Sequence, residues 1–234
     1  MRPGVVLALV SASSLALLGS APGTGSEPLP TRMADTGGGS QLIIAQADSA
    51  GSTSGTLTWW DLKDGQWVRA GTAPARFGEN GLVDGGSRVQ GTNTTPTGLY
   101  GLPFGFGIKA PPSGTSVEYR AVKESSWWCQ DNDSASYNRW VDPLPGDCRA
   151  SESEHLISYT TQYAYALAVG FNYDQPVRGR GAGIFLHVNG LGATAGCVSV
   201  PEDAMQRILR WAEPGKGPHM AIGTMDGVTA LTRY

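Results

Sequence analysis

Positive charge is scarce in this 234-residue chain, which has 17 Lys and Arg against 20 Asp and Glu and a formal net charge of −3. Charged residues make up only 16% of the sequence, and the most basic segment is the short run Arg178-Gly179-Arg180. A nucleic-acid-binding domain or a protein held on an anionic membrane would carry a larger basic patch. We therefore expect neither nucleic acid nor an anionic membrane surface as a partner.

Long apolar runs are also missing. The apolar stretch from Val5 to Leu18 is shorter than the roughly 20 residues that span a bilayer. It follows Arg2 and precedes the small residues Gly19-Ser20-Ala21, which is the pattern of a secretory signal peptide. We expect residues 1–21 to be a cleaved signal that leaves no stable membrane span, with an uncleaved anchor as the alternative.

Cysteine is rare, and its count of three is odd. In an exported protein two cysteines usually pair and one is left over. Cys129 and Cys148 flank a turn-rich stretch, so we expect a disulfide between them, which would stabilise the fold by on the order of 3 kcal/mol. Cys197 would then be the free thiol. The alternative is three buried, unreactive thiols.

Histidine is equally rare, with three in the chain. His155 follows Ser153-Glu154 and His219 follows Pro218, and both are expected at the surface or at an interface, whereas His187 ends an apolar run. The spacing of the histidines and Cys197 does not match a compact set of metal ligands. We therefore expect no metal and no cofactor.

Glycine and proline are abundant, with 33 and 15 residues, and their short clusters predict the many turns of a β-rich fold. Residues 22–40 have the composition of a flexible linker, so a single domain is expected over residues 41–234. Lys63-Asp64-Gly65 is a hairpin turn signal. The expected strands cover residues 41–47, 56–62, 66–68, 117–123, 161–173, 182–188 and 219–223.

One helix is predicted after Cys197. Ser199-Val200-Pro201-Glu202 matches a capping box, and Pro214-Gly215 would end the helix. Apolar residues between these signals recur at the helical period. Because Cys197 comes just before this segment, we expect the positive end of the helix dipole to stabilise a thiolate there.

Cys197 also lies ten residues after His187 and directly after Gly196. A thiol with a nearby base has the parts needed for nucleophilic acyl transfer. Glycine allows a tight turn, in which successive backbone N–H groups can face a developing oxyanion.

Three segments resemble the L,D-transpeptidase catalytic domain, also called the YkuD domain. Ile184-Phe185-Leu186-His187 and Thr194-Ala195-Gly196-Cys197-Val198 resemble its active-site signature, in the branch with the Ile-Phe-Leu-His form. Thr95-Pro96-Thr97-Gly98 is similar to its Thr-Pro-x-Gly turn. The resemblance implies a mainly β fold, a β-sandwich or mixed sheet with one or two short helices.

The resemblance also implies a reaction on peptidoglycan stem peptides. The cysteine attacks the carbonyl of the third-position diamino acid, expels the terminal D-Ala and forms a thioester. An amine of a second stem peptide then resolves the thioester, which makes a 3→3 cross-link. The protein would be secreted, associated with the cell wall and monomeric. Two alternatives stay open, namely an L,D-carboxypeptidase that uses water and a wall-associated module without turnover.

The family pattern gives each matching residue a role. It makes Cys197 the nucleophile and His187 the base, and it places an oxyanion hole at the backbone N–H groups of Cys197, Gly196 and Ala195. Many members have His at the position of Ala195 and Arg or Asn at that of Ser199, so these departures put the acceptor in doubt. The residues expected near the substrate are Thr194 and Ser199.

Other polar and aromatic residues have two interpretations. Trp127, Trp128 and Trp140 would either line a groove for a glycan-peptide strand or pack over a loop. The pair Glu152 and Glu154 is interpreted as a solvated face and not as an acid–base dyad.

Overall fold

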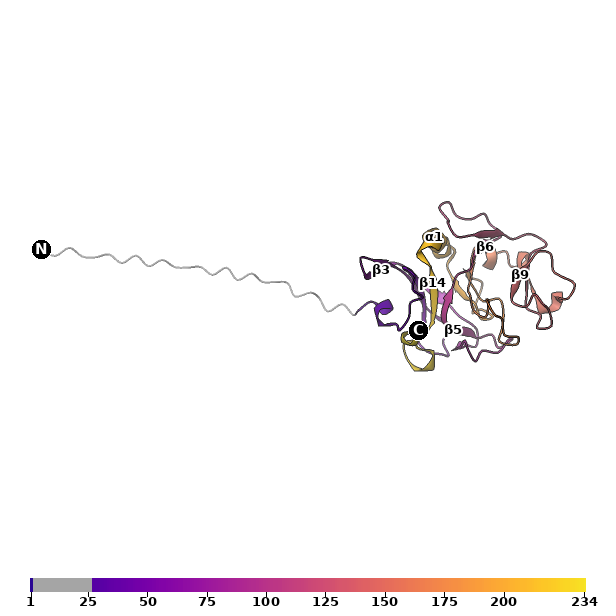
Figure 1. The fold of residues 1–234 in the computed structure, drawn as a ribbon, viewed down its shortest axis with the longest axis horizontal. Coiled ribbons are helices and arrows are strands. Elements are labelled where there is room, and N and C mark those ends of the chain that lie inside the picture. Colours follow the sequence, from indigo (N-terminus) through magenta and orange to yellow (C-terminus); the bar gives the residue numbers. More distant parts are fainter. Residues whose placement is uncertain (2–26) are drawn as a thin grey trace.

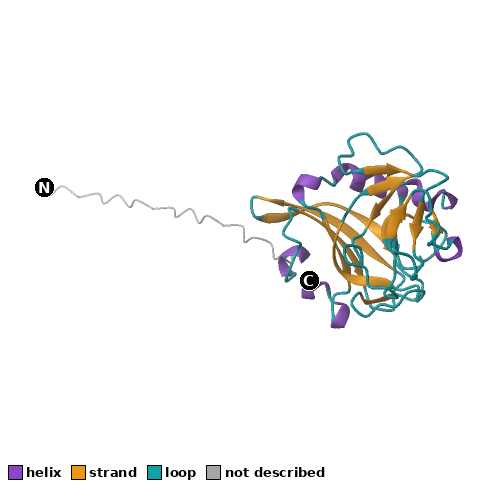
Figure 2. Ribbon diagram, turned by 45° about the vertical axis from the view of Figure 1, so that its right-hand side comes forward, coloured by secondary structure: helices purple, strands orange, loops and turns teal. Residues whose placement is uncertain are grey.

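The computed structural model describes Met1 and residues 27–234. Apart from Met1, the predicted signal peptide lies outside the described residues. The described chain is mainly β, as predicted, with a large mixed sheet and a small sheet (Figures 1 and 2). Its strands are β1 (Gln41–Ala47), β2 (Ser54–Lys63), β3 (Gln66–Arg76), β4 (Leu82–Asp84), β5 (Thr95–Gly101), β6 (Gly105–Gly107), β7 (Tyr119–Ala121), β8 (Trp127–Cys129), β9 (Arg139–Val141), β10 (Glu154–His155), β11 (Ala166–Ala168), β12 (Phe185–Val188), β13 (Val198–Val200) and β14 (His219–Gly223).

Helical structure is limited to short pieces. The described residues contain one α-helix, α1 (Glu202–Trp211), and no helix among them is long and apolar enough to cross a membrane. The remaining helical turns are of the 3-10 type and connect strands: η1 (Leu29–Arg32), η2 (Ala150–Glu152), η3 (Leu156–Ser158), η4 (Gln162–Ala164), η5 (Pro214–Lys216), η6 (Gly227–Thr229) and η7 (Leu231–Arg233).

The large sheet has eleven strands in the order β4-β5-β14-β1-β2-β3-β13-β12-β11-β6-β7. The predicted hairpin is confirmed, because β2 and β3 pair antiparallel across Asp64 and Gly65, whose φ angles are 50° and 76°. Both residues have positive φ, as a two-residue turn of the I′ type requires. The predicted strand over 161–173 is wrong except at β11, since residues 162–164 form the 3-10 turn η4. A short apolar run does not distinguish a buried strand from a buried turn.

The main core lies between the two halves of the large sheet. Inward residues of β1, β2, β3 and β14 share one hydrophobic cluster with inward residues of β12 and β13. Helix α1 packs into this cluster through Ala204, Met205, Ile208 and Leu209, which are at most 1% exposed. The predicted helix is thereby confirmed, and its apolar face closes the core beneath the strands that carry the site.

The start of α1 differs from the prediction. Ser199 lies in β13, not at a helix cap, and its hydroxyl donates to Asn189 Oδ1 at 2.8 Å. Pro201 occupies the N-cap position, and no side chain caps the helix there. The predicted capping box is wrong because pairing of Ser199 with His187 of β12 fixes it in a strand.

The small sheet has the order β10-β8-β9 and lies on the side of the molecule marked by β9 in Figure 1. Its aromatic residues form a second cluster with the outer face of β11 and β12. Residues 27–40, at the end of the segment expected to be a linker, contact the domain. Met33 is buried against Leu42 and Leu231.

Candidate active site

Strands β12 and β13 bring Cys197 and His187 to the same face of the large sheet. The two strands are parallel, and His187 is paired with Ser199. Side chains alternate along a strand, so His187 lies on the face of Phe185, opposite to Leu186 and Val188 in the main core. Cys197 belongs to the cluster of Phe185 and is therefore on this outer face too. The sheet register thus places the thiol and the imidazole on the same face of the sheet, with Cys197 level with Phe185 and His187 level with Ser199.

A cavity of about 250 Å³ opens onto this face. Its lining contains both residues predicted to be catalytic, and the others come from the loop after His187 and from the segment 154–163: Glu154, Tyr159, Gln162, Tyr163, His187, Gly190, Leu191, Gly192, Ala193, Thr194, Ala195 and Cys197.

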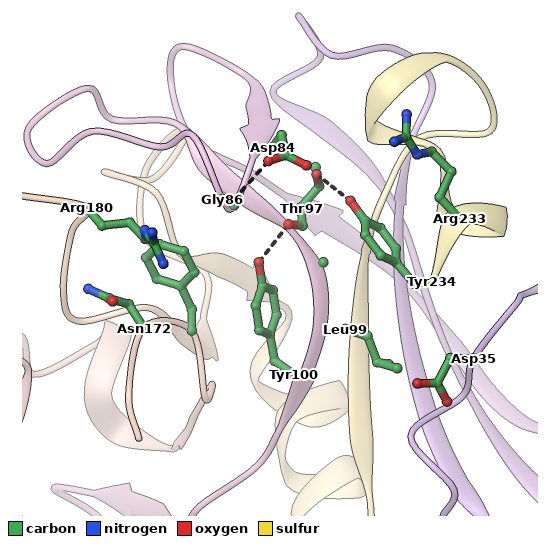
Figure 3. A pocket seen from close by; sticks show the side chains of 13 residues that line it. Asp35, Asp84, Gly86, Thr97, Leu99, Tyr100, Asn172, Arg180, Arg233 and Tyr234 are labelled. Atoms are coloured by element: carbon green, nitrogen blue, oxygen red, sulfur yellow. Dashed lines mark hydrogen bonds between the residues drawn. The ribbon is translucent and has the colours of Figure 1, made fainter. Parts of the chain in front are cut away.

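A larger cavity of about 570 Å³ shares no lining residue with the first. Figure 3 shows its charged and aromatic side chains, with Arg180 and Arg233 on opposite sides and Tyr100 between them. The Tyr100 hydroxyl donates to the Thr97 carbonyl at 2.6 Å. This cavity contains no cysteine or histidine, so the smaller cavity is the candidate site for nucleophilic chemistry.

The Cys197 thiol is buried and held by backbone groups. Its Sγ lies 3.4 Å from the Gly183 carbonyl, to which it donates, and 3.3 Å from the Phe185 N–H, from which it accepts. Burial raises the pKa of the thiol to about 12, and the negative charge of Glu154 adds to this shift. At neutral pH the sulfur is therefore protonated in the resting protein and needs a base to become a nucleophile.

His187 has the protonation state of such a base. Its Nδ1–H donates to the Val188 carbonyl at 2.8 Å, which leaves Nε2 as the free acceptor. Burial lowers the pKa of the imidazole to about 4, so it is neutral at pH 7. The edge of Tyr163 packs against its ring, with 5.6 Å between the centroids. Within residues 27–234, no hydrogen bond joins the imidazole to Sγ.

The turn before Cys197 is held by two threonines. Thr194 Oγ1 donates to the Cys197 carbonyl at 2.6 Å and accepts the Gly196 N–H at 3.1 Å. Thr95 Oγ1 donates to the same carbonyl at 3.3 Å, which gives the Thr-Pro-x-Gly segment a place in the site. In the described part of the chain, the N–H groups of Ala195 and Cys197 donate to no other group, and both residues line the cavity.

Gly196 must be glycine for geometric reasons. Its φ of +132° is one that L side chains rarely adopt. A Cβ there would lie 2.9 Å from the Thr94 carbonyl and 2.8 Å from Arg88 Nη2. Arg88, whose guanidinium lies against this turn, was not predicted from the sequence.

Arg88 is a buried cation, 6% exposed. Its Nε donates to the Thr94 carbonyl at 2.8 Å and its Nη1 to the Arg180 carbonyl at 3.3 Å. Among the described residues no carboxylate lies within ion-pair distance of it. Burial lowers the pKa of this guanidinium, and its positive charge opposes the rise in the pKa of Cys197. No local signal in the Gly- and Ser-rich sequence around Arg88 could have found it.

Glu154 is not on a solvated face, so that interpretation was wrong for this residue. Glu152 is exposed, but Glu154 lies in β10 and lines the cavity. The Tyr163 hydroxyl donates to its Oε2, and Gln130 Nε2 donates to its Oε1 at 2.6 Å. Burial raises the pKa of this carboxyl group, and the two hydrogen bonds partly offset that shift.

The other residues considered from sequence lie away from the cavity. Ser199 is fully buried, with its hydroxyl bound to Asn189. The tryptophans pack instead of lining the cavity: Trp128 is 1% exposed, and Trp127 stacks on His155 at 4.2 Å. His219 begins β14, and its Nδ1–H donates to the Gly217 carbonyl at 2.8 Å.

The predicted effect of the helix dipole is also wrong. Helix α1 begins at Glu202, and β13 separates it from Cys197. Five residues of extended chain place the helix start roughly 15 Å from Cys197. A dipole effect is confined to the first turn of a helix, so it does not reach the thiol.

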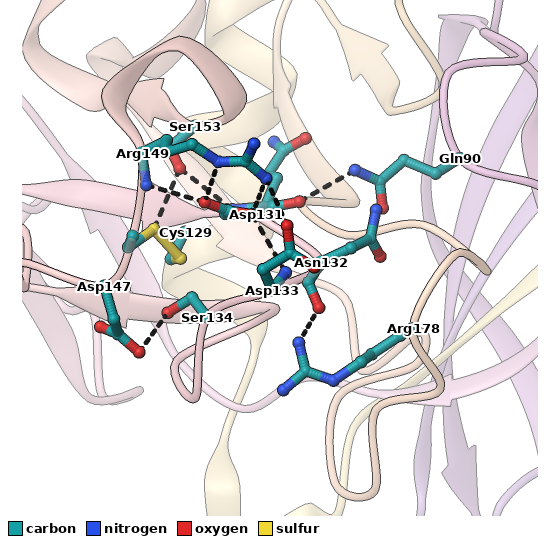
Figure 4. A network of polar contacts seen from close by, with 12 residues as sticks. Gln90, Cys129, Asp131, Asn132, Asp133, Ser134, Asp147, Arg149, Ser153 and Arg178 are labelled. Atoms are coloured by element: carbon teal, nitrogen blue, oxygen red, sulfur yellow. Dashed lines mark hydrogen bonds and ion pairs between the residues drawn. A yellow bond between two sulfur atoms is a disulfide. The ribbon is translucent and has the colours of Figure 1, made fainter.

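A polar network holds the small sheet beside the cavity (Figure 4). The predicted disulfide is present, with Cys129 and Cys148 joined and Cys197 free. Asp131, which is fully buried, accepts hydrogen bonds from Arg149 Nε at 2.7 Å and from the Arg149 N–H at 2.9 Å. These bonds hold the pKa of the Asp131 carboxyl well below its usual range. The network fixes β8 and the segment that leads into β10.

One of three comparisons with known proteins identifies a family. The model of the L,D-transpeptidase catalytic domain (YkuD) matches residues 50–220. No curated protein sequence matches the chain significantly. Among solved structures, that of Bd1075 from Bdellovibrio bacteriovorus is similar over 79% of this chain and 48% of its own, with 16% identity and a TM-score of 0.40. The chain thus spans about half the length of that protein.

Proposed function

The chain belongs to the L,D-transpeptidase catalytic domain (YkuD) family, and we propose that it is an exported peptidoglycan transpeptidase with Cys197 as its nucleophile. One observation carries the proposal: a free thiol and a neutral imidazole share one cavity with two backbone N–H groups that donate to no group within residues 27–234. The disulfide between Cys129 and Cys148 fits a protein that works outside the cytoplasm. The signal peptide over residues 1–21 stays a prediction.

The first half-reaction forms the thioester. As Sγ turns from the Gly183 carbonyl, its proton passes to His187 Nε2 and the sulfur attacks the carbonyl carbon of the third residue of a stem tetrapeptide. The N–H groups of Ala195 and Cys197 hold the resulting oxyanion. The bond to the terminal D-Ala then breaks, and its amine takes the proton from His187. Because the Gly196 N–H is bound to Thr194, we exclude it from the oxyanion hole expected from sequence.

The second half-reaction releases the acyl group. An amine of another stem peptide attacks the thioester carbonyl, a C–N bond forms and the C–S bond breaks. The proton of the amine returns to sulfur through His187, which restores the resting thiol. Thr194 shapes the turn in both steps, because its hydroxyl holds the Cys197 carbonyl.

Intact-protein mass spectrometry tests the proposal. After incubation with a tetrapeptide donor or a carbapenem, we expect one acyl adduct on the wild type and none on Cys197→Ala. An equal adduct on both proteins, or none on the wild type, would contradict it. Analysis of the products then identifies the acceptor, since an amine gives a 3→3 cross-link and water gives a free tripeptide.

A further inference from the structure

The cavity contains a carboxylate for which the reaction above has no use. Glu154 lies in it together with Cys197 and His187. Its two oxygens accept hydrogen bonds from Tyr163 and Gln130, so the group is held in a fixed orientation. Within residues 27–234, no Lys, Arg or His lies at ion-pair distance from it. A partly buried carboxylate without a cation is costly unless a ligand supplies the positive charge.

The carboxylate and the thiol are close to the same glycine. A Cβ on Gly183 would lie 3.4 Å from Glu154 Oε1, and the Gly183 carbonyl accepts the Cys197 thiol at 3.4 Å. Gly183 has a φ of +65°, and the Gln130 amide leaves no room for a side chain there. A cation bound at Glu154 is therefore a near neighbour of the sulfur.

The other groups around the cavity leave Glu154 as its source of negative charge. Tyr163 from η4 and the nearby Tyr159 have a pKa raised by burial, so both stay neutral. His187 from β12 is neutral above its lowered pKa, and the Cys197 thiol is protonated. Arg88 lies behind the turn, bound to backbone carbonyls, and does not pair with Glu154.

We propose that Glu154 is a binding site for a primary ammonium group of the substrate, held beside the acyl carbon on Cys197. The inference rests on the proposed function, in which both the side chain of the diamino acid donor and the incoming acceptor carry such a group. An acceptor ammonium loses one proton to solvent before its free amine attacks the thioester, and the second proton goes to sulfur as the amide forms. Binding has a second effect, because a cation at Glu154 cancels the negative charge that opposes ionisation of the thiol. The ammonium group thus recruits the substrate and favours the reactive form of Cys197.

Thiol labelling tests this site without any peptidoglycan. Cys197 is the free thiol, so its rate of disulfide formation with methanethiosulfonate reagents is measured directly. The thiolate attacks the reagent sulfur, a mixed disulfide forms and methanesulfinate leaves. We compare 2-aminoethyl methanethiosulfonate, which carries a primary ammonium, with the neutral methyl reagent. For each reagent, the rate with the protein is divided by the rate of the same reagent with a free thiol. The normalised rate of the cationic reagent is then divided by that of the neutral reagent, and the thiolate fraction of Cys197 cancels because it enters both rates.

Glu154→Gln is expected to lower this cation-to-neutral ratio about tenfold, as loss of one nearby charge would. The matched control is Glu152→Gln, which removes the same charge from an exposed position two residues earlier and should leave the ratio unchanged. Equal ratios in the wild type and both variants would overturn the proposal. If Glu154→Gln does not fold, the wild type alone provides the test. A wild-type labelling rate with the cationic reagent that is no higher than the rate with the anionic 2-sulfonatoethyl reagent would also overturn the proposal.

Acyl transfer then identifies which substrate carries the ammonium. A donor with a free side-chain amine is compared with its N-acetylated form, and amine transfer is compared with hydrolysis. If Glu154→Gln loses the preference for the donor with a free amine, the site binds the donor. If it loses the preference for amine transfer over hydrolysis, the site binds the acceptor. A labelling ratio that depends on Glu154, without acylation by any donor, would contradict the transpeptidase and leave the ammonium site in place.

Discussion

The large and small sheets contribute to the cavity in different ways. The large sheet supplies His187 from β12 and Cys197 from the position directly before β13, and the inner faces of these two paired strands are packed in the main core. The small sheet supplies Glu154 from a two-residue strand that is held by a disulfide and buried polar groups. The difference suggests that the regular sheet fixes the chemistry and the irregular one fixes which charge the cavity accepts. Changes in each sheet should then have separable effects.

The largest effect is expected in the large sheet. His187→Ala removes the base and should slow acylation of Cys197 by about 10²- to 10⁴-fold. The loss should be the same for donors with and without a side-chain ammonium, because both need the proton transfer. Stopped-flow or quenched mass spectrometry of acyl-enzyme formation measures it.

The pH dependence of the wild type serves as a check on this assignment. The pKa of His187 is lowered to about 4, and only the neutral imidazole accepts a proton. The acylation rate with an uncharged donor should therefore fall only as the pH approaches 4. An inflection near 6.5, the ordinary value for histidine, would show that the base is not this buried imidazole.

An intermediate effect is expected from the disulfide of the small sheet. The double variant Cys129→Ser/Cys148→Ser should lose about 3 kcal/mol of unfolding free energy, because the unfolded chain gains the freedom of the opened loop. Urea unfolding measures this loss. Acylation by an uncharged donor should persist in the folded protein, whereas the preference for ammonium reagents should decrease. Unchanged stability would mean that the polar network alone holds the small sheet.

The smallest effect is expected from Asp131→Asn, and it should depend on pH. The pKa of Asp131 is depressed in the folded state, so its carboxylate stabilises the fold above the ordinary aspartate value of about 3.9. That contribution is lost as the pH falls toward the lower folded pKa. The melting temperatures of wild type and variant should thus differ at pH 7 and converge in acid. Asp133→Asn, an exposed partner of the same arginine, is the control and should not change the melting temperature.

The sequence predicted the large sheet better than the small one. Alternation and the turn signal at Asp64 and Gly65 were enough for the β2–β3 hairpin, because these patterns are local. Cys197 and His187 were found from a motif that ends β12 and leads into the adjacent strand β13. Ser199 was misassigned to a helix cap, because a capping sequence does not show whether its first residue is already paired in a strand.

Glu154 and Arg88 could not be predicted in this way. Glu152 and Glu154 have similar neighbours in sequence, and it is the fold that places the second of them beside Gln130 and Tyr163. Arg88 is buried by Thr94, Arg180 and the turn at Gly196, which are brought together by the fold. Charges that are set by distant contacts leave no local pattern.

For the exported protein proposed above, the deep position of Cys197 also bears on maturation outside the cytoplasm. A third thiol endangers a disulfide, because a thiolate attacks the bridge and exchanges partners with it. Burial raises the pKa of the Cys197 thiol to about 12, so the thiol is protonated at pH 7, and its sulfur lies in the cavity and not on the open surface. Once the domain has folded, Cys197 therefore does not exchange with the disulfide between Cys129 and Cys148. The burial that keeps the Cys197 thiol protonated in the resting protein therefore also protects the pairing of Cys129 with Cys148.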